Sequence, residues 1–199
     1  MRKLFPCQSL LKVGGLLAVG ILVGMMLRAW FVEGEAIAIA QEKGGSGAEE
    51  QLRKLKIELP PVSKPTNTLV NAVRVGDLLY VSGTGPGKVD GKALVGRLGE
   101  GFEVKDGRAA ARQVGLQILS VVKAELGSLD KVQRLVKTLG MVNATQEFKQ
   151  HPEVINGFSD LMVEVFGAEA GKGARSAVGM SSLPGGIPVE IEAIFQVRK

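Results

Sequence analysis

Histidine and cysteine are nearly absent from this chain, whose 199 residues contain one of each, His151 and Cys7. A single cysteine permits no disulfide within the chain. One cysteine and one histidine also provide too few ligands for a cysteine or histidine metal site. Because Pro152 follows His151 directly, this histidine is typical of a loop or helix start and not of a Ser-His-Asp triad. The sequence therefore predicts no bound metal and no serine-triad hydrolase.

The chain also lacks a basic region interleaved with aromatic residues. Aromatic residues make up only 5% of the sequence, and the formal net charge of the whole chain is +5. From Ala48 onward, 20 Lys and Arg side chains face 17 Asp and Glu side chains, a difference of only three charges. The electrostatic footprint of a nucleic-acid-binding protein is missing, so no nucleic-acid partner is expected.

A hydrophobic run is present near the N terminus, where residues 13–27 carry no charge. Lys12 and Arg28 flank the run and can reach the membrane surface, which brings its length close to that of a spanning helix. We therefore predict that residues 1–32 form a hydrophobic anchor or signal segment, and we favour an uncleaved membrane anchor. The alternative is a signal peptide cleaved after Ala40, where small residues occupy the positions that a signal peptidase reads. Both interpretations place the folded domain on the periplasmic or extracytoplasmic side.

Behind this segment the composition predicts a linker at residues 33–59 and a single α/β domain at residues 60–199. Residues 41–50 are rich in glycine, serine and charged residues, and residues 51–57 can add a helical turn. Hydrophobic periodicity predicts strands at 69–75, 78–82, 93–98 and 132–142, and helices at 104–126 and 153–166. We expect one mixed β-sheet with two helices on one face. The opposite face would then be free to pack against other subunits.

The C-terminal segment alternates apolar and polar residues, which places Glu190 and Glu192 on the face opposite the apolar side chains. The turn-forming residues that begin at Pro184 predict that this strand pairs with the preceding extended run as an antiparallel hairpin. In that hairpin Arg175 and Glu190 would share a face but lie about 20 Å apart. A site that uses both residues would need a second copy of the subunit, so an oligomer is expected.

Three parts of the sequence together resemble the RidA/YjgF family, the reactive-intermediate or enamine/imine deaminases. They are Val-Gly-Asp-Leu-Leu-Tyr-Val-Ser-Gly at 75–83, Asn156 within residues 154–161, and Arg-Ser-Ala-Val at 175–178 followed by Leu-Pro and Val-Glu-Ile-Glu-Ala-Ile. The resemblance implies a chorismate-mutase-like fold and a homotrimer with ligand sites in the clefts between subunits. It also implies that the protein uses no metal and no organic cofactor.

The resemblance assigns roles to six residues. Arg175 would hold the carboxylate of a 2-imino acid, because a guanidinium can form two parallel charged hydrogen bonds with it. Glu190 would orient or activate the water that converts the imine to a 2-keto acid and ammonia. The remaining residues would complete the substrate pocket: Ser82, Gly83, Asn156 and Ala177.

Simpler interpretations of these residues stay open. Arg175 also fits a surface or interface ion pair. Periodicity does not distinguish Glu190 from Glu192, since both project from the same face of one strand. Asn156 is typical of a position near a helix start, where its side chain serves the backbone. Ser82 fits an ordinary strand end.

Two positions depart from the family pattern in ways that bear on activity. Leu69 stands where the deaminases commonly have a tyrosine, and Ala177 stands where they frequently have a cysteine. Both changes remove polar side chains from the expected pocket. Three hypotheses follow: a cofactor-independent imine deaminase, a non-catalytic trimeric module that binds small carboxylates, and an endoribonuclease. The near-neutral charge of the domain disfavours the third.

Overall fold

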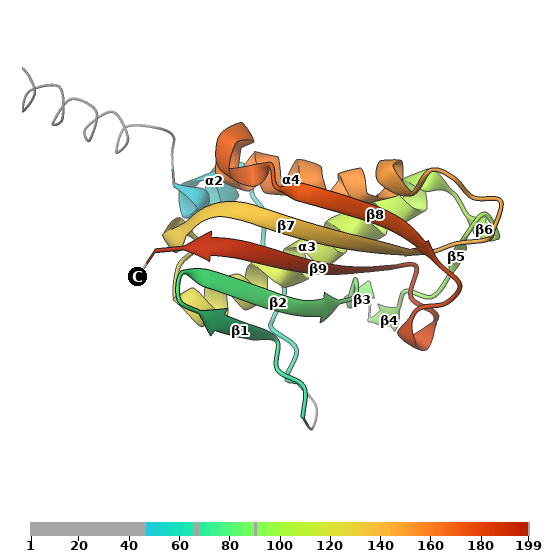
Figure 1. Cartoon of the computed structure of the whole chain (residues 1–199), viewed down its shortest axis with the longest axis horizontal. Helices are drawn as coiled ribbons and strands as arrows, with labels where there is room; N and C mark the ends of the chain where they lie inside the picture. The colour runs from blue at the N-terminus through green and yellow to red at the C-terminus, as the bar shows by residue number, and fades with distance from the viewer. Residues whose placement is uncertain (1–46, 66–67, 90, 199) are drawn as a thin grey trace, which may run out of the picture. The chain divides into compact units, whose positions relative to one another are not determined.

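The computed structural model of the chain describes residues 47–65, 68–89 and 91–198 (Figure 1). The predicted anchor or signal segment at residues 1–32 and the predicted cleavage site after Ala40 lie outside these residues. In the part of the chain that is described, no helix is both long and apolar enough to cross a membrane.

Five strands form the main sheet in the spatial order β1-β2-β9-β7-β8. β8 is parallel to β7, whereas the other neighbouring pairs are antiparallel. The sheet is therefore mixed, as the sequence predicts. Its strands are β1 (Ala72–Val75), β2 (Leu78–Thr84), β7 (Val132–Asn143), β8 (Ala174–Met180) and β9 (Val189–Val197).

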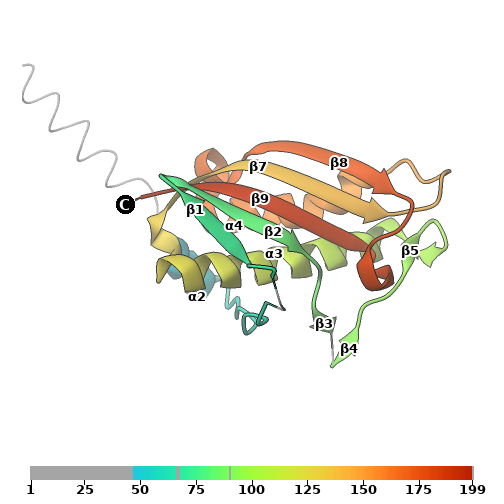
Figure 2. The same ribbon diagram turned by 60° about the horizontal axis from the view of Figure 1, so that its bottom comes forward.

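Two long helices, α3 (Val104–Leu126) and α4 (His151–Gly171), cover one side of this sheet (Figure 2). They pack closely against each other at Gly157, where an added Cβ would overlap the carbonyl oxygen of Arg108. The bounds of α3 coincide with the predicted helix at 104–126. α4 begins two residues before the predicted helix at 153–166, and Gly167, with φ of 80° and ψ of 167°, breaks its helical backbone directly after the predicted end.

Local signals explain where α3 begins and ends. The Asp106 carboxylate accepts a hydrogen bond of 2.9 Å from the Glu103 backbone N–H, which satisfies a donor at the start of the helix. Gly127 ends the helix in the left-handed region, with φ of 79°, a conformation that glycine adopts without steric cost.

A third helix, α2 (Ala48–Lys54), corrects the expectation of two helices. It lies in the stretch that the sequence analysis assigned to a linker. Ala48 and Leu52, which are 7% and 5% exposed, belong to the hydrophobic core. The domain therefore includes residues from Ala48 onward, because these two apolar side chains lie on the same face of one helical turn.

Short elements connect the long ones. The predicted strand at 93–98 is replaced by two-residue strands, because Gly96 and two later glycines with positive φ, Gly99 and Gly101, turn the chain repeatedly. These elements are β3 (Lys88–Val89), β4 (Lys92–Ala93), β5 (Arg97–Leu98), β6 (Gly101–Phe102) and the 3-10 helices Leu129–Lys131 and Pro184–Gly186.

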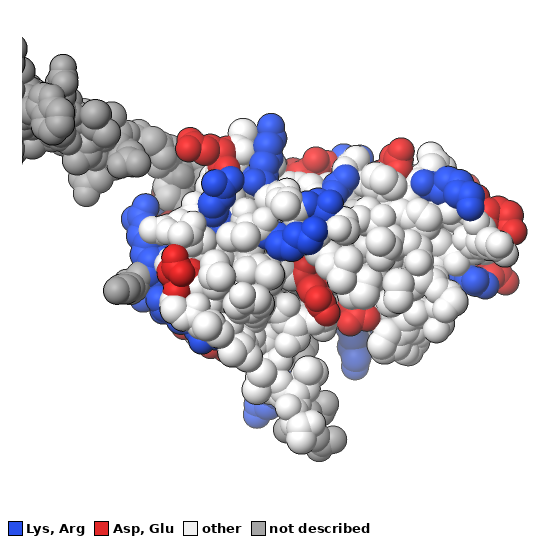
Figure 3. Space-filling view, in the orientation of Figure 1, with Lys and Arg blue, Asp and Glu red and all other residues white. Residues whose placement is uncertain are grey.

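Alternate residues of the strands define two sides of the sheet, which we call the helix side and the open side. On β9 the helix side is buried, and Phe195 there is 0% exposed. The open side carries Glu190, Glu192 and Ile194 from the same strand. It continues across the sheet with apolar residues that include Val73, Val75, Tyr80, Leu139, Met141 and Val178. Figure 3 shows white surface over much of this side, with red side chains near its middle and at its left and blue ones across its upper part.

The predicted C-terminal hairpin is wrong. β8 and β9 do not pair with each other, because β7 lies between them and pairs with both. The turn residues at Pro184–Gly186 form a 3-10 helix that carries the chain across β7 instead of a tight hairpin turn. Turn chemistry predicted the reversal correctly but could not reveal the strand inserted between the two runs.

Candidate functional site

Arg175 forms a hydrogen-bonded cluster at the edge of the sheet. Its Nη1 donates to Oδ1 of Asn156 at 2.8 Å and to Oγ of Ser159 at 3.0 Å, and both partners lie on α4. The cluster is accessible, since Arg175 itself is exposed and its two partners are half-buried. Among the described residues, the other two guanidinium nitrogens have no recorded partner. The cluster therefore presents a fixed, permanently charged fork that can accept a carboxylate.

Helical spacing accounts for the two contacts from α4. Asn156 and Ser159 are three residues apart, so they lie on the same face of the helix and meet the same guanidinium. The sequence pattern indicated Asn156 but not Ser159. Three-residue spacing from Asn156 on a predicted helix was the signal that pointed to it. The contact also shows that Asn156 serves Arg175 and not the end of the helix backbone.

Ala177 follows Arg175 on the same side of β8. It is half-buried and packs against the hydrophobic core, opposite Gly140 of β7. Its methyl group contributes no polar contact. Any role of this position in ligand binding therefore falls to its backbone.

Glu190 forms a second candidate group on β9. It is half-buried, and burial raises the pKa of its carboxyl above the usual range, with a further increase from the charge of Glu192. Glu192 is exposed. The structure thus distinguishes two glutamates that periodicity could not separate. A carboxyl with a raised pKa is better suited to exchange protons near neutral pH.

Gly83 and Ser82 lie on β2 beside Glu190. A Cβ at Gly83 would overlap Oε1 of Glu190, so the glycine leaves the space that this carboxyl occupies. The pairing of β2 with β9 is irregular between Val81 and Thr84, which is the local signature of a β-bulge. The Ser82 hydroxyl donates to the carbonyl oxygen of Val70 at 2.7 Å. Ser82 therefore holds the chain that leads into β1, in addition to any contact with a ligand.

The two candidate groups lie on opposite sides of the sheet, which corrects the expectation that Arg175 and Glu190 share a face. Arg175 is aligned with Thr138 of β7, and Glu190 is aligned with Met141 of the same strand. Positions three apart on a regular strand project to opposite sides. One subunit consequently brings Arg175 together with Asn156, and Glu190 together with Gly83, but does not unite the two groups.

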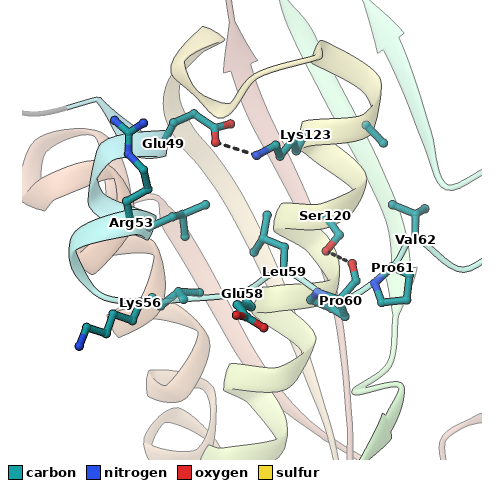
Figure 4. Close-up of a pocket in the computed structure, with 13 residues that line it drawn as sticks. Glu49, Arg53, Lys56, Glu58, Leu59, Pro60, Pro61, Val62, Ser120 and Lys123 are labelled. Carbon is teal, nitrogen blue, oxygen red and sulfur yellow. Dashed lines mark hydrogen bonds and ion pairs between the residues drawn. The ribbon is translucent and has the colours of Figure 1, made fainter.

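A separate groove of about 820 Å³ runs between α2, the segment that follows it, and the C-terminal half of α3 (Figure 4). Figure 4 shows the contacts that cross it: Lys123 donates to Glu49 at 2.7 Å, and the Ser120 hydroxyl donates to the carbonyl oxygen of Pro60 at 2.7 Å. Glu49 also accepts from the backbone N–H of Leu129. These polar groups are paired within the chain, so the groove serves to attach α2 to α3. It contains none of the predicted site residues.

The fold and the arginine cluster define a chorismate-mutase-like α/β domain with a cationic site at the sheet edge. Residues 49–185 match the family described as "YjgF/chorismate_mutase-like, putative endoribonuclease". This match spans more than half of the chain, so the protein belongs to the YjgF family, as its sequence motifs predicted.

Individual relatives support this assignment. Protein TCP17 of Trypanosoma cruzi is 42% identical over 147 residues, which cover 74% of this chain and 92% of that protein. The structure of Atu1372 from Agrobacterium tumefaciens, a protein described as having unknown function, has a TM-score of 0.68 and 39% identity and covers 76% of this chain and 92% of its own. A structure named "putative endoribonuclease" from Shewanella oneidensis has a TM-score of 0.71 and 27% identity, and covers 76% of this chain and all of its own.

Proposed function

We propose that this protein hydrolyses small reactive imino acids, and enamine acids that tautomerise to them, to 2-keto acids and ammonia. The observation that carries this proposal is the Arg175 cluster, because Asn156 and Ser159 hold the guanidinium while its remaining donors stay available. A 2-imino acid offers a carboxylate to those donors next to an electrophilic carbon. Membership of the YjgF family supports the proposal.

A complete site requires two subunits. One subunit would supply Arg175, Asn156, Ser159 and Ala177, and a neighbouring subunit would supply Glu190 with Ser82 and Gly83. The placement of the two groups on opposite sides of the sheet favours this division. The exposed apolar residues of the open side favour contact between copies of the chain. We propose a homotrimer, which the family resemblance implies, with the sites in its clefts.

The reaction needs no group beyond these side chains and water. Arg175 would hold the substrate carboxylate, and Glu190 would accept a proton as the water oxygen bonds to the carbon of the protonated imine. Glu190 would return the proton to the nitrogen of the resulting carbinolamine. Cleavage of the C–N bond would then release ammonia, and transfer of the hydroxyl proton to Glu190 or water would leave the 2-keto acid. The raised pKa of Glu190 suits it to both the uptake and the return of that proton.

A non-catalytic carboxylate-binding module is the alternative. It is favoured by the apolar Leu69 and Ala177, which provide no polar side chain near the proposed site, and by the Ser82 hydroxyl, which is bonded to Val70. In this alternative Arg175 still captures a small carboxylate, but Glu190 drives no hydrolysis. An endoribonuclease, which the family description and one structural relative name, fits the near-neutral domain less well.

The deciding experiment measures ammonia release from 2-iminopropanoate generated in situ. The wild type should exceed the uncatalysed rate, and Arg175→Ala should lose roughly 100-fold in kcat/KM, since charged hydrogen bonds contribute about 1.5 to 3 kcal/mol each. Arg112→Ala is the matched control, because Arg112 pairs with Glu164 on the helix surface. It should retain activity.

Other outcomes separate the alternatives. No acceleration, together with a thermal stabilisation by 2-keto acids that depends on Arg175, would establish the binding module and reject the deaminase. RNA affinity that falls steeply with salt would favour the nuclease. The absence of all three responses in a folded protein would contradict a carboxylate site at Arg175.

We also propose that the N-terminal hydrophobic run exports the domain, either as an anchor or as a cleaved signal. The support is the uncharged run at 13–27 with flanking positive charge. A reporter enzyme that is active only outside the cytoplasm, fused after residue 45, should be active. The mass of the mature protein distinguishes a retained anchor from a chain that begins at Gln41.

A further inference from the structure

A hollow of about 530 Å³ lies where the C-terminal end of β8 meets the start of α4. Arg97 of β5 and the segment between β7 and α4, which includes Lys149, line its other walls. Neither the Arg175 cluster nor Glu190 belongs to its lining. The hollow is therefore distinct from the proposed deaminase site, although Gly179 in its wall lies on the same side of β8 as Arg175.

The lining is positively charged. It contains Arg97, Lys149 and His151, and it contains no aspartate or glutamate. Glu100 pairs with Arg97 at 3.4 Å, but this carboxylate is 70% exposed, so the pair neutralises little of the charge. The Nε–H of Arg97 is buried and has no hydrogen-bond partner among the described residues. The Arg97 Nη2 donates to the carbonyl oxygen of Ala144 at 3.2 Å, so the guanidinium is held against the wall of the hollow.

His151 is held at this hollow by two neighbours. A Cβ at Gly179 would overlap Nε2 of His151, so the glycine lets the imidazole lie directly on β8. The Phe148 ring contacts the imidazole edge to face, with centroids 5.3 Å apart. Burial lowers the pKa of His151, as does the charge of Lys149, whereas Glu153 opposes these effects.

The start of α4 adds to this field. His151 is the first residue of a 21-residue helix, and Gln150 before it provides no side-chain cap. Because His151 lines the hollow, the positive end of the helix dipole lies close to it. Thr145 and Ser181 contribute hydroxyl groups to the same lining.

We propose that this hollow binds a small oxyanion, a phosphate or a carboxylate, through Arg97, Lys149 and His151. Arg97 and Lys149 would supply positive charge, and His151 would donate from its ring. The site is independent of the proposed deaminase activity. A carboxylate ligand could be a 2-keto acid product, and a phosphate ligand could be part of a phosphorylated metabolite.

The only histidine of the chain makes the test specific, because a titration of imidazole NMR signals then reports on His151 alone. The full-length protein is prepared without a histidine tag and titrated in sodium chloride, in sodium phosphate and in pyruvate at matched ionic strength. A bound anion should raise the pKa of His151. The increase should be one unit for each factor of ten by which the anion binds the protonated form more tightly than the neutral form. A response to phosphate only, to pyruvate only, or to both identifies the source of the oxyanion.

Variants decide whether the hollow is the site. Arg97→Gln and Lys149→Gln should each reduce the anion-dependent shift at least threefold. Lys172→Gln, which removes an exposed charge at the other end of α4, should leave it unchanged. Arg175→Ala should also preserve it, which separates this site from the proposed catalytic one. Equal shifts in chloride and in the test anions, or full shifts in both hollow variants, would overturn the proposal.

Discussion

The helix side and the open side of the sheet are built from alternating residues of the same strands, yet only one of them is completed by the chain itself. On the helix side, Phe195 and Ile191 are 0% exposed beneath α3 and α4. On the open side, Val75 is 60% exposed and Val73 is 49% exposed. A strand that buries one apolar row and exposes another indicates a second partner for the exposed row. The fold is therefore encoded within one subunit, whereas the proposed site requires a second one.

The largest expected effect comes from replacing, one at a time, two neighbouring residues of β9 whose side chains face opposite sides of the sheet. Phe195→Ala should lower the free energy of unfolding by about 3 to 5 kcal/mol, because it leaves a cavity in the core. Ile194→Ala, one residue away on the open side, should cost much less. Urea denaturation followed by circular dichroism, at equal protein concentrations, measures both changes. Equal losses would show that the two sides are equally complete in one subunit.

A charge placed on the open side should break the proposed assembly without unfolding the subunit. Val73→Lys would place a charge in the proposed apolar interface, and we expect a weakening of about 2 kcal/mol or more, roughly 30-fold in the dissociation constant. Val62→Lys is the matched control, since Val62 is exposed in the segment after α2 and lies outside the sheet. Sedimentation velocity over a range of concentrations measures the change. An unchanged oligomer, or a wild type that is already monomeric, would reject the open side as the interface.

Much of the helix side could be predicted from the sequence because its signals are local. The apolar stripe of α3, its acidic start and Gly127 lie within one continuous segment, and the predicted helix matches the observed one. The alternation in β9 likewise identified its buried row. These patterns depend on the period of a helix or a strand and not on which elements become neighbours.

The candidate site was harder to predict because it depends on long-range pairing. Turn residues indicated that the chain reverses after β8, but they carry no information on the insertion of β7 between β8 and β9. That insertion moves Arg175 to the opposite side of the sheet from Glu190. The contact of Ser159 with Arg175 required the crossing of α4 over β8, and the burial of Glu190 required the bulge in β2. Sequence periodicity specifies none of these arrangements.

The Arg175 cluster provides an intermediate test of the helix side. Ser159→Ala removes one of two hydrogen bonds that hold the guanidinium, so the Kd for a 2-keto acid should rise by roughly 5- to 30-fold, or about 1 to 2 kcal/mol. Asp160→Ala is the matched control, because Asp160 is the next residue of α4 and pairs with Arg108 instead. Isothermal titration calorimetry with pyruvate measures both variants. An unchanged Kd in Ser159→Ala would mean that Ser159 does not position Arg175.

The smallest expected effect concerns Glu190 on the open side and depends on pH. Burial raises the pKa of Glu190 in the folded subunit, so the fold favours the protonated form. Its stabilising contribution is complete below the pKa of the unfolded chain and is lost as the pH rises through the higher folded pKa. Glu190→Gln cannot ionise, so its stability relative to the wild type should increase as the pH is raised from about 4 toward neutral.

Glu169→Gln, at an exposed position of α4, is the control for the general loss of a carboxylate. Urea denaturation at a series of pH values measures these differences at matched assembly states. Parallel pH profiles for Glu190→Gln and the wild type would show that Glu190 is solvated like an ordinary surface residue, and the open side would then lose its proposed proton acceptor.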